Sequence, residues 1–251
     1  MGHTSRTLAA MALCAGATAA HPSESSLDFA VNVSRHVLLH EVGHALIREF
    51  DLPMLANEED MADSFATLFI VQEMRDDARA VLKDRARSWL YEGAQVSPED
   101  YDLEGEHELD TRRAFRTICL LYGADPAEFS DVIGWIGLSE DDADDCSDFT
   151  PDMIRGWESV LASHRLPAGQ LSDKVVVQYG DASHTAAVLQ SALLEDVAQL
   201  MRQFAWPQPI LLHYDSCGRE GSSWSRSKRR ILLCDEYLGR FVRQERVAPR
   251  N

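Results

Sequence analysis

The chain has 251 residues, of which 45% are hydrophobic and 26% charged, with 14 glycines and 9 prolines. This composition excludes collagen-like, low-complexity and disordered chains and predicts a globular protein with a sizeable core. No stretch approaches the roughly 20 uninterrupted apolar residues that cross a bilayer, so we expect no membrane span. The 24 basic and 41 acidic residues give a formal charge of −17, which repels phosphate backbones and excludes nucleic acid as an expected partner.

The first twenty residues are typical of a secretory signal. Arg6 supplies a short positive region, residues 7–15 are apolar, and Ala17-Thr18-Ala19 form a small-x-small cleavage site. A buried N-terminal helix is the alternative, but the apolar stretch has no polar face. We therefore expect a signal peptide at residues 1–20 and an exported protein, either periplasmic or extracellular.

Four cysteines follow the predicted signal, namely Cys119, Cys146, Cys217 and Cys234. An even number of cysteines in an oxidising compartment predicts two disulfides. Three pairings are open, and the spacing favours Cys119 with Cys146 and Cys217 with Cys234. A four-thiolate zinc site is disfavoured because the chain has no Cys-x-x-Cys unit.

Helical periodicity dominates residues 21–165. The apolar spacing predicts a helix over residues 27–50, ended by Asp51-Leu52-Pro53, and its length of about 36 Å suits the central helix of a domain. The acidic run at 140–148 lacks the ligand spacing of a calcium loop, so we expect a solvated loop there. Further helices are predicted at 58–74, 76–91, 111–122, 126–136 and 151–164.

The pattern changes in residues 166–251, which contain the predicted strands. Short strands are expected at 175–177, 210–214 and 230–233, and helices at 185–204 and 235–244. The last two strands flank a loop at 218–228 and could pair as a hairpin, with a disulfide near its two ends. We therefore predict an α+β fold, mostly helical with a small C-terminal sheet, in which 21–165 and 166–251 form one domain.

The chemistry is concentrated in the predicted central helix, at His40-Glu41-Val42-Gly43-His44. A spacing of four residues places the two imidazoles on one helix face, one turn apart, where both can ligate one zinc ion (Zn2+). Zinc lowers the pKa of a water toward about 7, and the carboxylate of Glu41 can accept the proton as the water attacks a polarised carbonyl. Gly43 leaves room for another segment to pack close to the histidines.

The alternative interpretation is that these are ordinary polar positions of an amphipathic helix. The motif, however, lies among apolar residues, and burial of its charged groups without a partner would cost several kcal/mol. A metal resolves this conflict. His36 lies four residues before His40 and could replace His44 as a ligand, but no glutamate would then stand in the usual place, so we interpret His36 as structural or as a residue that supports the ligands without binding the metal.

The third zinc ligand is expected from the start of the next helix. Glu59 and Asp63 lie one turn apart, so Glu59 can ligate the metal while Asp63 accepts a hydrogen bond from a ligand histidine and fixes its tautomer. Acidic residues are common at helix N-termini for dipole reasons alone. Glu58, Asp60 and Asp63 itself remain alternative ligands.

These segments resemble a metallopeptidase family of exported bacterial proteins that is classed as a domain of unknown function. The resemblance rests on residues 39–47, 51–53 and 58–63, and extends more diffusely through 106–110, 119–126, 217–218 and 234–236. The Glu-x-x-Ala-Asp element is also similar to that of the gluzincin peptidases, in which the glutamate is the third zinc ligand. The resemblance implies a zincin-like domain with Glu59 in that role.

We therefore expect an exported zinc metallopeptidase that acts on a peptide or protein substrate. A peptidase also needs a group that stabilises the oxyanion, and His107 is the first candidate, ahead of Tyr101 and Arg112. The alternative hypotheses are a catalytically inactive, zinc-stabilised binding module and a metal-free helical scaffold.

Overall fold

The computed structural model describes residues 24–54, 56–101 and 107–247, so the predicted signal peptide lies outside the described residues. Among the described helices, none has both the length and the apolarity that crossing a bilayer requires.

The helices are α1 (Glu24–Glu49), α2 (Glu58–Glu73), α3 (Arg75–Gly93), α4 (Asp110–Ala124), α5 (Asp131–Ile136), α6 (Glu140–Leu161), α7 (Thr185–Gln190), α8 (Leu193–Met201) and α9 (Asp235–Glu245), with a short 3-10 helix at Pro98–Asp100. The strands are β1 (Val175–Tyr179), β2 (Ile210–Asp215), β3 (Ser222–Ser225) and β4 (Arg230–Cys234). The predicted α+β class is confirmed.

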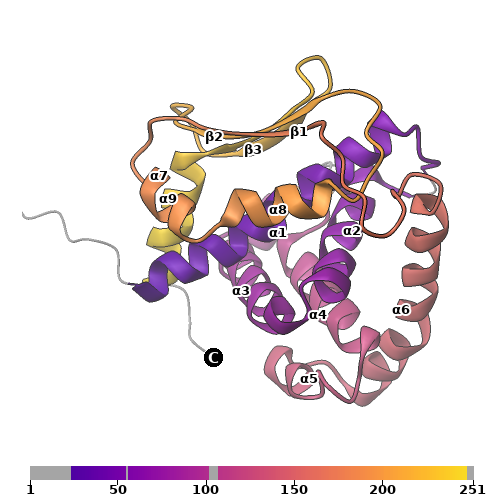
Figure 1. Ribbon diagram of the computed structural model, residues 1–251. Coiled ribbons are helices and arrows are strands. Elements are labelled where there is room, and N and C mark those ends of the chain that lie inside the picture. Colours follow the sequence, from indigo (N-terminus) through magenta and orange to yellow (C-terminus); the bar gives the residue numbers. More distant parts are fainter. Residues whose placement is uncertain (1–23, 55, 102–106, 248–251) are drawn as a thin grey trace, which may run out of the picture.

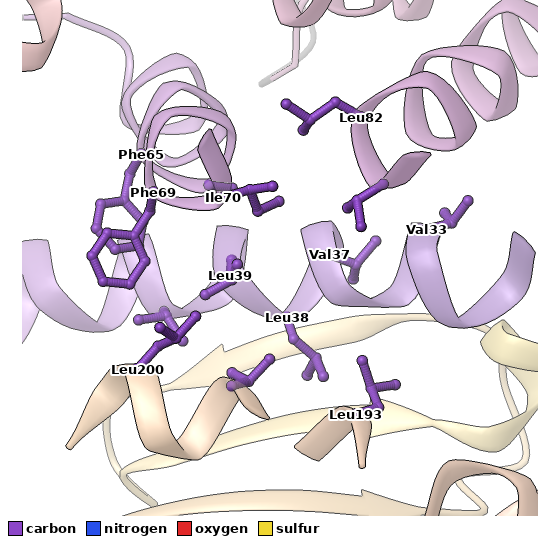
Figure 2. Packing of buried hydrophobic residues seen from close by; sticks show 14 of the residues in the cluster. Val33, Val37, Leu38, Leu39, Phe65, Phe69, Ile70, Leu82, Leu193 and Leu200 are labelled. Atoms are coloured by element: carbon purple, nitrogen blue, oxygen red, sulfur yellow. The ribbon is translucent and has the colours of Figure 1, made fainter. Parts of the chain in front are cut away.

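Helix α1 is the centre of the molecule. It runs between a helical layer made by α2, α3 and α4 and a second layer made by the sheet with α8 and α9 (Figure 1). Val37 faces α3, whereas Leu38 faces α8 (Figure 2). Both layers contribute to one buried hydrophobic cluster, which includes Leu38, Leu82 and Leu193. Most side chains of α1 are buried, because the two layers cover it on opposite sides.

The sheet has the order β1-β2-β4-β3, with β1, β2 and β4 parallel and β3 antiparallel to β4. The predicted hairpin of residues 210–214 and 230–233 is therefore wrong, because these two strands pair in parallel. The segment between them contains β3, and the chain turns back through Arg229, which has a φ of 43°. As a result β3 forms the edge of the sheet and lies beside α1.

The acidic run at 140–148 forms the first half of α6, so the predicted solvated loop is also wrong. Ser139 caps this helix, and its side chain and that of Asp142 form a capping box. Acidic residues in the first turn are stabilised by the helix dipole. The helix continues through Pro151, so the predicted helix at 151–164 is only its second half.

Two other predicted helices are shorter than the sequence pattern indicates. The predicted helix at 185–204 is interrupted between α7 and α8, where Ala192 adopts a left-handed conformation with a φ of 55°. In the predicted helix at 126–136, regular structure begins only at Asp131. Periodicity continues across both breaks because the residues on either side still face the core.

The described part of the chain contains two disulfides, in the pairing that the cysteine spacing favours. Cys119–Cys146 joins α4 to α6, and Cys217–Cys234 joins the segment after β2 to the end of β4, with Cα–Cα distances of 5.2 and 5.4 Å. Gly123 allows the first of these contacts, because a Cβ there would lie 2.1 Å from the carbonyl oxygen of Cys146. The second disulfide fixes the base of the segment that carries β3.

Candidate metal centre

The two histidines of the motif face α2 across a close helix contact. Going along α1 from His40 to His44, their partners on α2 run backward from Asp63 to Glu58, so the two helices are antiparallel here. Gly43 makes the contact possible, since a Cβ at this position would lie 3.0 Å from the Cα of Ala62. The Asn57 side chain caps α2 by accepting a hydrogen bond from the backbone N–H of Glu59, which places the acidic first turn beside the histidines.

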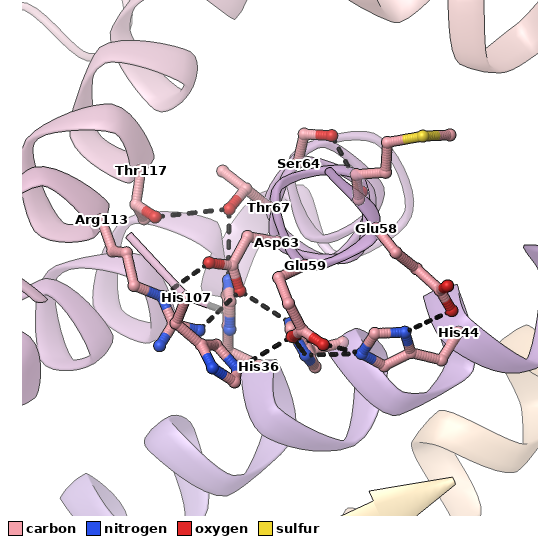
Figure 3. A network of polar contacts seen from close by, with 12 residues as sticks. His36, His44, Glu58, Glu59, Asp63, Ser64, Thr67, His107, Arg113 and Thr117 are labelled. Carbon is pink, nitrogen blue, oxygen red and sulfur yellow. Dashed lines mark hydrogen bonds and ion pairs between the residues drawn. The ribbon is translucent and has the colours of Figure 1, made fainter. Parts of the chain in front are cut away.

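Three ligand atoms converge where α1 and α2 meet. The Nε2 atoms of His40 and His44 are 3.0 Å apart, and Glu59 Oε2 lies 3.1 Å from the first and 3.4 Å from the second (Figure 3). The three atoms are close enough to one another to bind the same ion, and these residues form a group that could hold a metal. Two imidazoles and a carboxylate are a donor set that zinc prefers.

Hydrogen bonds on the far side of each imidazole determine which nitrogen faces this point. His40 Nδ1 lies 2.7 Å from Asp63 Oδ1, and Asp63 also accepts two hydrogen bonds from Arg113 at 2.8 and 3.0 Å. Because an ionised carboxylate only accepts, His40 donates from Nδ1. His44 donates in the same way to Glu58, at 3.0 Å, and Glu58 also accepts from Arg48.

With both Nδ1 atoms donating, a neutral imidazole presents only a lone pair at Nε2. The lone pairs of His40 and His44 then face each other and the carboxylate of Glu59, which is a repulsive arrangement. Glu59 Oε2 is buried and makes no hydrogen bond of acceptable geometry with any described residue, although imidazole nitrogens lie nearby. A cation at this point satisfies all three acceptors, so the residues fit a metal ion.

The pKa shifts express the same electrostatic preference. Burial lowers the pKa of His40, but the contacts with the carboxylates of Asp63 and Glu59 outweigh burial and raise it to about 9. Burial also lowers the pKa of His44, and the Glu59 carboxylate again reverses the shift and raises it. Burial raises the pKa of Glu59, yet the imidazoles of His107, His40 and His44 hold it well below its usual range. The centre therefore stabilises positive charge.

Glu41 is buried beside this centre and is held by the sheet. Its Oε2 accepts a hydrogen bond of 2.6 Å from the backbone N–H of Trp224 on β3. Burial raises the pKa of its carboxyl group. Glu41, the three converging residues and Trp224 all line one cleft of about 820 Å³, called here the histidine cleft. Its walls are α1, α2, α3 and α4 on the helical side and β3 with α9 on the other.

His107 is the predicted oxyanion group that the structure brings into the histidine cleft. Its Nε2 lies 2.8 Å from Glu59 Oε2, and its ring stacks on that of His40 with a centroid distance of 6.2 Å. Tyr101 and Arg112 are exposed and are not among the described residues that line the cleft. The two weaker candidates are therefore not brought to the centre.

The alternative ligands are engaged elsewhere. His36 Nε2 contacts the Thr67 hydroxyl at 3.2 Å, and burial lowers the pKa of this histidine. Asp60 lies 3.5 Å from Arg116, while Glu58 contacts the Nδ1 side of His44 rather than its Nε2 side.

Sequence reasoning missed several residues of the cleft. Arg113 binds Asp63 and Arg48 binds Glu58, the acidic partners of the two histidines. Neither arginine belongs to a recognisable sequence motif with its partner. Trp224 lies in a serine-rich segment without strand alternation, and its contact with Glu41 spans 183 residues. Arg85 and Tyr237, which also line the cleft, occupy ordinary helical positions.

Comparison with protein families identifies the relatives of this chain. The model of the family DUF4344, described as "Putative metallopeptidase", matches residues 7–161 and so includes both α1 and α2. The chain belongs to this family. The comparisons with curated proteins and with solved structures each gave no significant match. Family membership supports a metal-dependent peptidase.

Proposed function

We propose that the protein is an exported, zinc-dependent metallopeptidase in which His40, His44 and Glu59 hold the zinc ion and Glu41 is the general base. The single observation that carries the proposal is the convergence of His40 Nε2, His44 Nε2 and Glu59 Oε2, which lie within 3.4 Å of one another. Membership of a metallopeptidase family supports it independently. By this proposal the substrate is a peptide or protein.

A zinc ion bound by these residues would supply a Lewis acid that polarises the peptide carbonyl and makes a water acidic. Glu41 performs the proton transfers. Its Oε2 is occupied by the Trp224 N–H, so Oε1 is the atom that accepts the proton of the attacking water and returns it to the leaving amine nitrogen. The fixed orientation of this carboxylate lowers the entropic cost of reaching the transition state.

Other residues of the chain orient the ligands. Asp63 and Glu58 accept hydrogen bonds from the Nδ1 atoms, which keeps each Nε2 directed at the centre and makes each imidazole more basic. His107 is close enough to the centre to donate a hydrogen bond to the oxyanion of the tetrahedral intermediate. Export is supported by the two disulfides, which persist in oxidising compartments.

The test is the Glu41→Gln variant of the zinc-loaded protein. It should bind one zinc per chain, as the wild type does, and should lose hydrolysis of an unfolded protein substrate such as casein. The zinc content is measured by elemental analysis and the cleavage by mass spectrometry. Retained hydrolysis would remove Glu41 from the role of base, and wild-type protein without zinc would remove the metal.

A zinc-stabilised binding module without turnover is the second candidate. The observation that favours it is the position of His107, 2.8 Å from the proposed ligand Glu59, where it could become a fourth ligand and close the site. The His107→Ala variant separates the two functions. In a peptidase it loses rate and keeps zinc affinity, whereas in a closed site it loses zinc affinity.

A further inference from the structure

Arg85 is a buried cation of the histidine cleft that the proposed mechanism does not use. The residue comes from α3, is 4% exposed and forms part of the cleft wall. Its Nε and Nη1 atoms are buried, and neither has a hydrogen-bond partner among the described residues. Within the same part of the chain, no carboxylate forms an ion pair with its guanidinium group.

Burying a charged group without a counter-charge is strongly unfavourable. The guanidinium of Arg85 lies 3.8 Å from the ring centroid of Trp89, and this cation–π contact offsets part of the cost. Burial lowers the pKa of Arg85, but a guanidinium stays protonated at any physiological pH. The fold therefore keeps a positive charge in the wall of the cleft.

The neighbouring cations differ from Arg85 because their charges are compensated. Arg113 lies over the same indole ring, 4.5 Å from its centroid, and binds Asp63 with two hydrogen bonds. Arg48 pairs with Glu58 at the other end of the cleft. Among the buried arginines that line the described cleft, Arg85 is therefore the one without a carboxylate partner from the chain.

Arg85 lines the same cleft as the three residues of the metal centre, so a peptide that fills the cleft can extend from one to the other. The Trp89 ring on which it stacks contacts the ring of His36 edge-on, with a centroid distance of 5.2 Å. His36 precedes His40 by one helical turn, which is about 6 Å along α1. An extended peptide advances about 3.3 Å per residue, so this offset corresponds to roughly one or two residues of substrate.

We propose that Arg85 binds a carboxylate of the substrate, which makes the enzyme selective for peptides with an acidic group one or two residues from the scissile bond. The carboxylate can be a glutamate or aspartate side chain or the free C-terminus. A carboxylate can satisfy the guanidinium through two charge-assisted hydrogen bonds, and it is the anionic group of unmodified amino acids. That a bond of the bound peptide is cleaved rests on the proposed function, but selective binding of the peptide does not require cleavage.

Binding is measured by calorimetry with the zinc-loaded Glu41→Gln protein, so that no probe is cleaved. The first probe is an acetylated and amidated alanine-rich hexapeptide with one glutamate, moved through the central positions. The second is its glutamine counterpart, and the third has no acidic side chain but a free C-terminal carboxylate. The glutamate or the free-carboxylate peptide should bind about tenfold or more tightly than the glutamine peptide, and which of the two does so identifies the source of the carboxylate. Equal binding of all three overturns the proposal.

Variants of two arginines on the same helix then assign the selectivity. Arg85→Met should abolish the preference for the carboxylate, and Arg85→Lys should keep part of it, since the charge remains but the bidentate geometry is lost. Arg87→Met is the matched control. Arg87 also lies on α3 and over an aromatic ring, 4.4 Å from the Phe29 centroid, but outside the cleft, so this variant should bind the probes as the parent does.

The exposed Arg226 of the β3–β4 loop is the competing explanation, because it also lines the cleft. If Arg226→Gln loses the preference and Arg85→Met keeps it, the assignment to Arg85 is overturned. If Arg85→Met does not fold, the peptide comparison in the parent and the Arg85→Lys variant still decide the question. If the zinc-loaded wild-type protein hydrolyses no peptide but still binds the carboxylate peptides selectively, the proposed function is wrong and the proposed carboxylate site is supported.

Discussion

The two walls of the histidine cleft are built in different ways. On the helical wall, each of the two histidines is held by another side chain, His40 by Asp63 and His44 by Glu58. On the sheet wall, the contact with Glu41 comes from a backbone N–H, that of Trp224. The helical wall can therefore be altered one side chain at a time, whereas the sheet wall depends on where the edge strand lies. Variants of each wall should separate metal binding from catalysis.

The largest effect is expected from the third ligand on the helical wall. Glu59→Ala removes the carboxylate oxygen that lies within 3.4 Å of both Nε2 atoms, and zinc affinity should fall by more than about a hundredfold. Affinity is measured by competition with a chromophoric chelator. Asp60→Ala is the matched control from the same helical turn and should bind zinc as the wild type does. If the control loses zinc and Glu59→Ala retains it, the ligand assignment is wrong.

A smaller effect on the same wall is expected from Asp63→Asn. The amide cannot provide the negative charge that makes His40 more basic and pairs with Arg113, so zinc affinity should fall by about 10- to 100-fold. The same chelator competition measures it, with thermal unfolding of the metal-free protein as a separate measure of folding. Unchanged affinity would mean that the aspartate serves only the ion pair with Arg113.

The helical wall is also the part that the sequence predicts best. A five-residue motif on one helix fixes the relation of His40 to His44, and a short connection brings Glu59 and Asp63 to them, so local spacing determines most of the geometry. The sheet wall depends on contacts between residues far apart in the chain. Trp224 belongs to a strand with no alternating pattern. Arg85 of the helical wall is an exception to the local rule, because its sequence position does not distinguish it from a surface arginine and its contact with Trp89 depends on the fold.

On the sheet wall, Trp224→Pro should reduce turnover and leave zinc affinity unchanged. Proline removes the N–H that holds Glu41, and an edge strand tolerates proline where that N–H points away from the neighbouring strand. Loss of a hydrogen bond to a charged group predicts a fall in kcat of about tenfold or more. Trp224→Ala keeps the N–H and is the matched control, so a similar fall in both variants would assign the effect to the indole ring.

The smallest effect concerns the segment that leads into the sheet wall. The Glu236 carboxylate accepts hydrogen bonds from the backbone N–H groups of Cys217 and Gly218 and from the Ser216 hydroxyl. These contacts, the Cys217 N–H first, lower the pKa of Glu236 to about 2. Because the pKa is lower in the folded state, the stabilisation is complete above the ordinary carboxyl pKa of about 4.3 and is lost as the pH falls toward 2.

Glu236→Gln removes this pH dependence while keeping the shape of the side chain. The free energy of unfolding of wild type and variant, measured by urea denaturation, should therefore differ at pH 6 and converge as the pH is lowered to about 2. A difference that stays constant over this range would mean that the contribution of Glu236 does not depend on its charge. Because the Cys217–Cys234 disulfide already fixes this segment, the variant should alter stability while zinc binding on the helical wall stays the same.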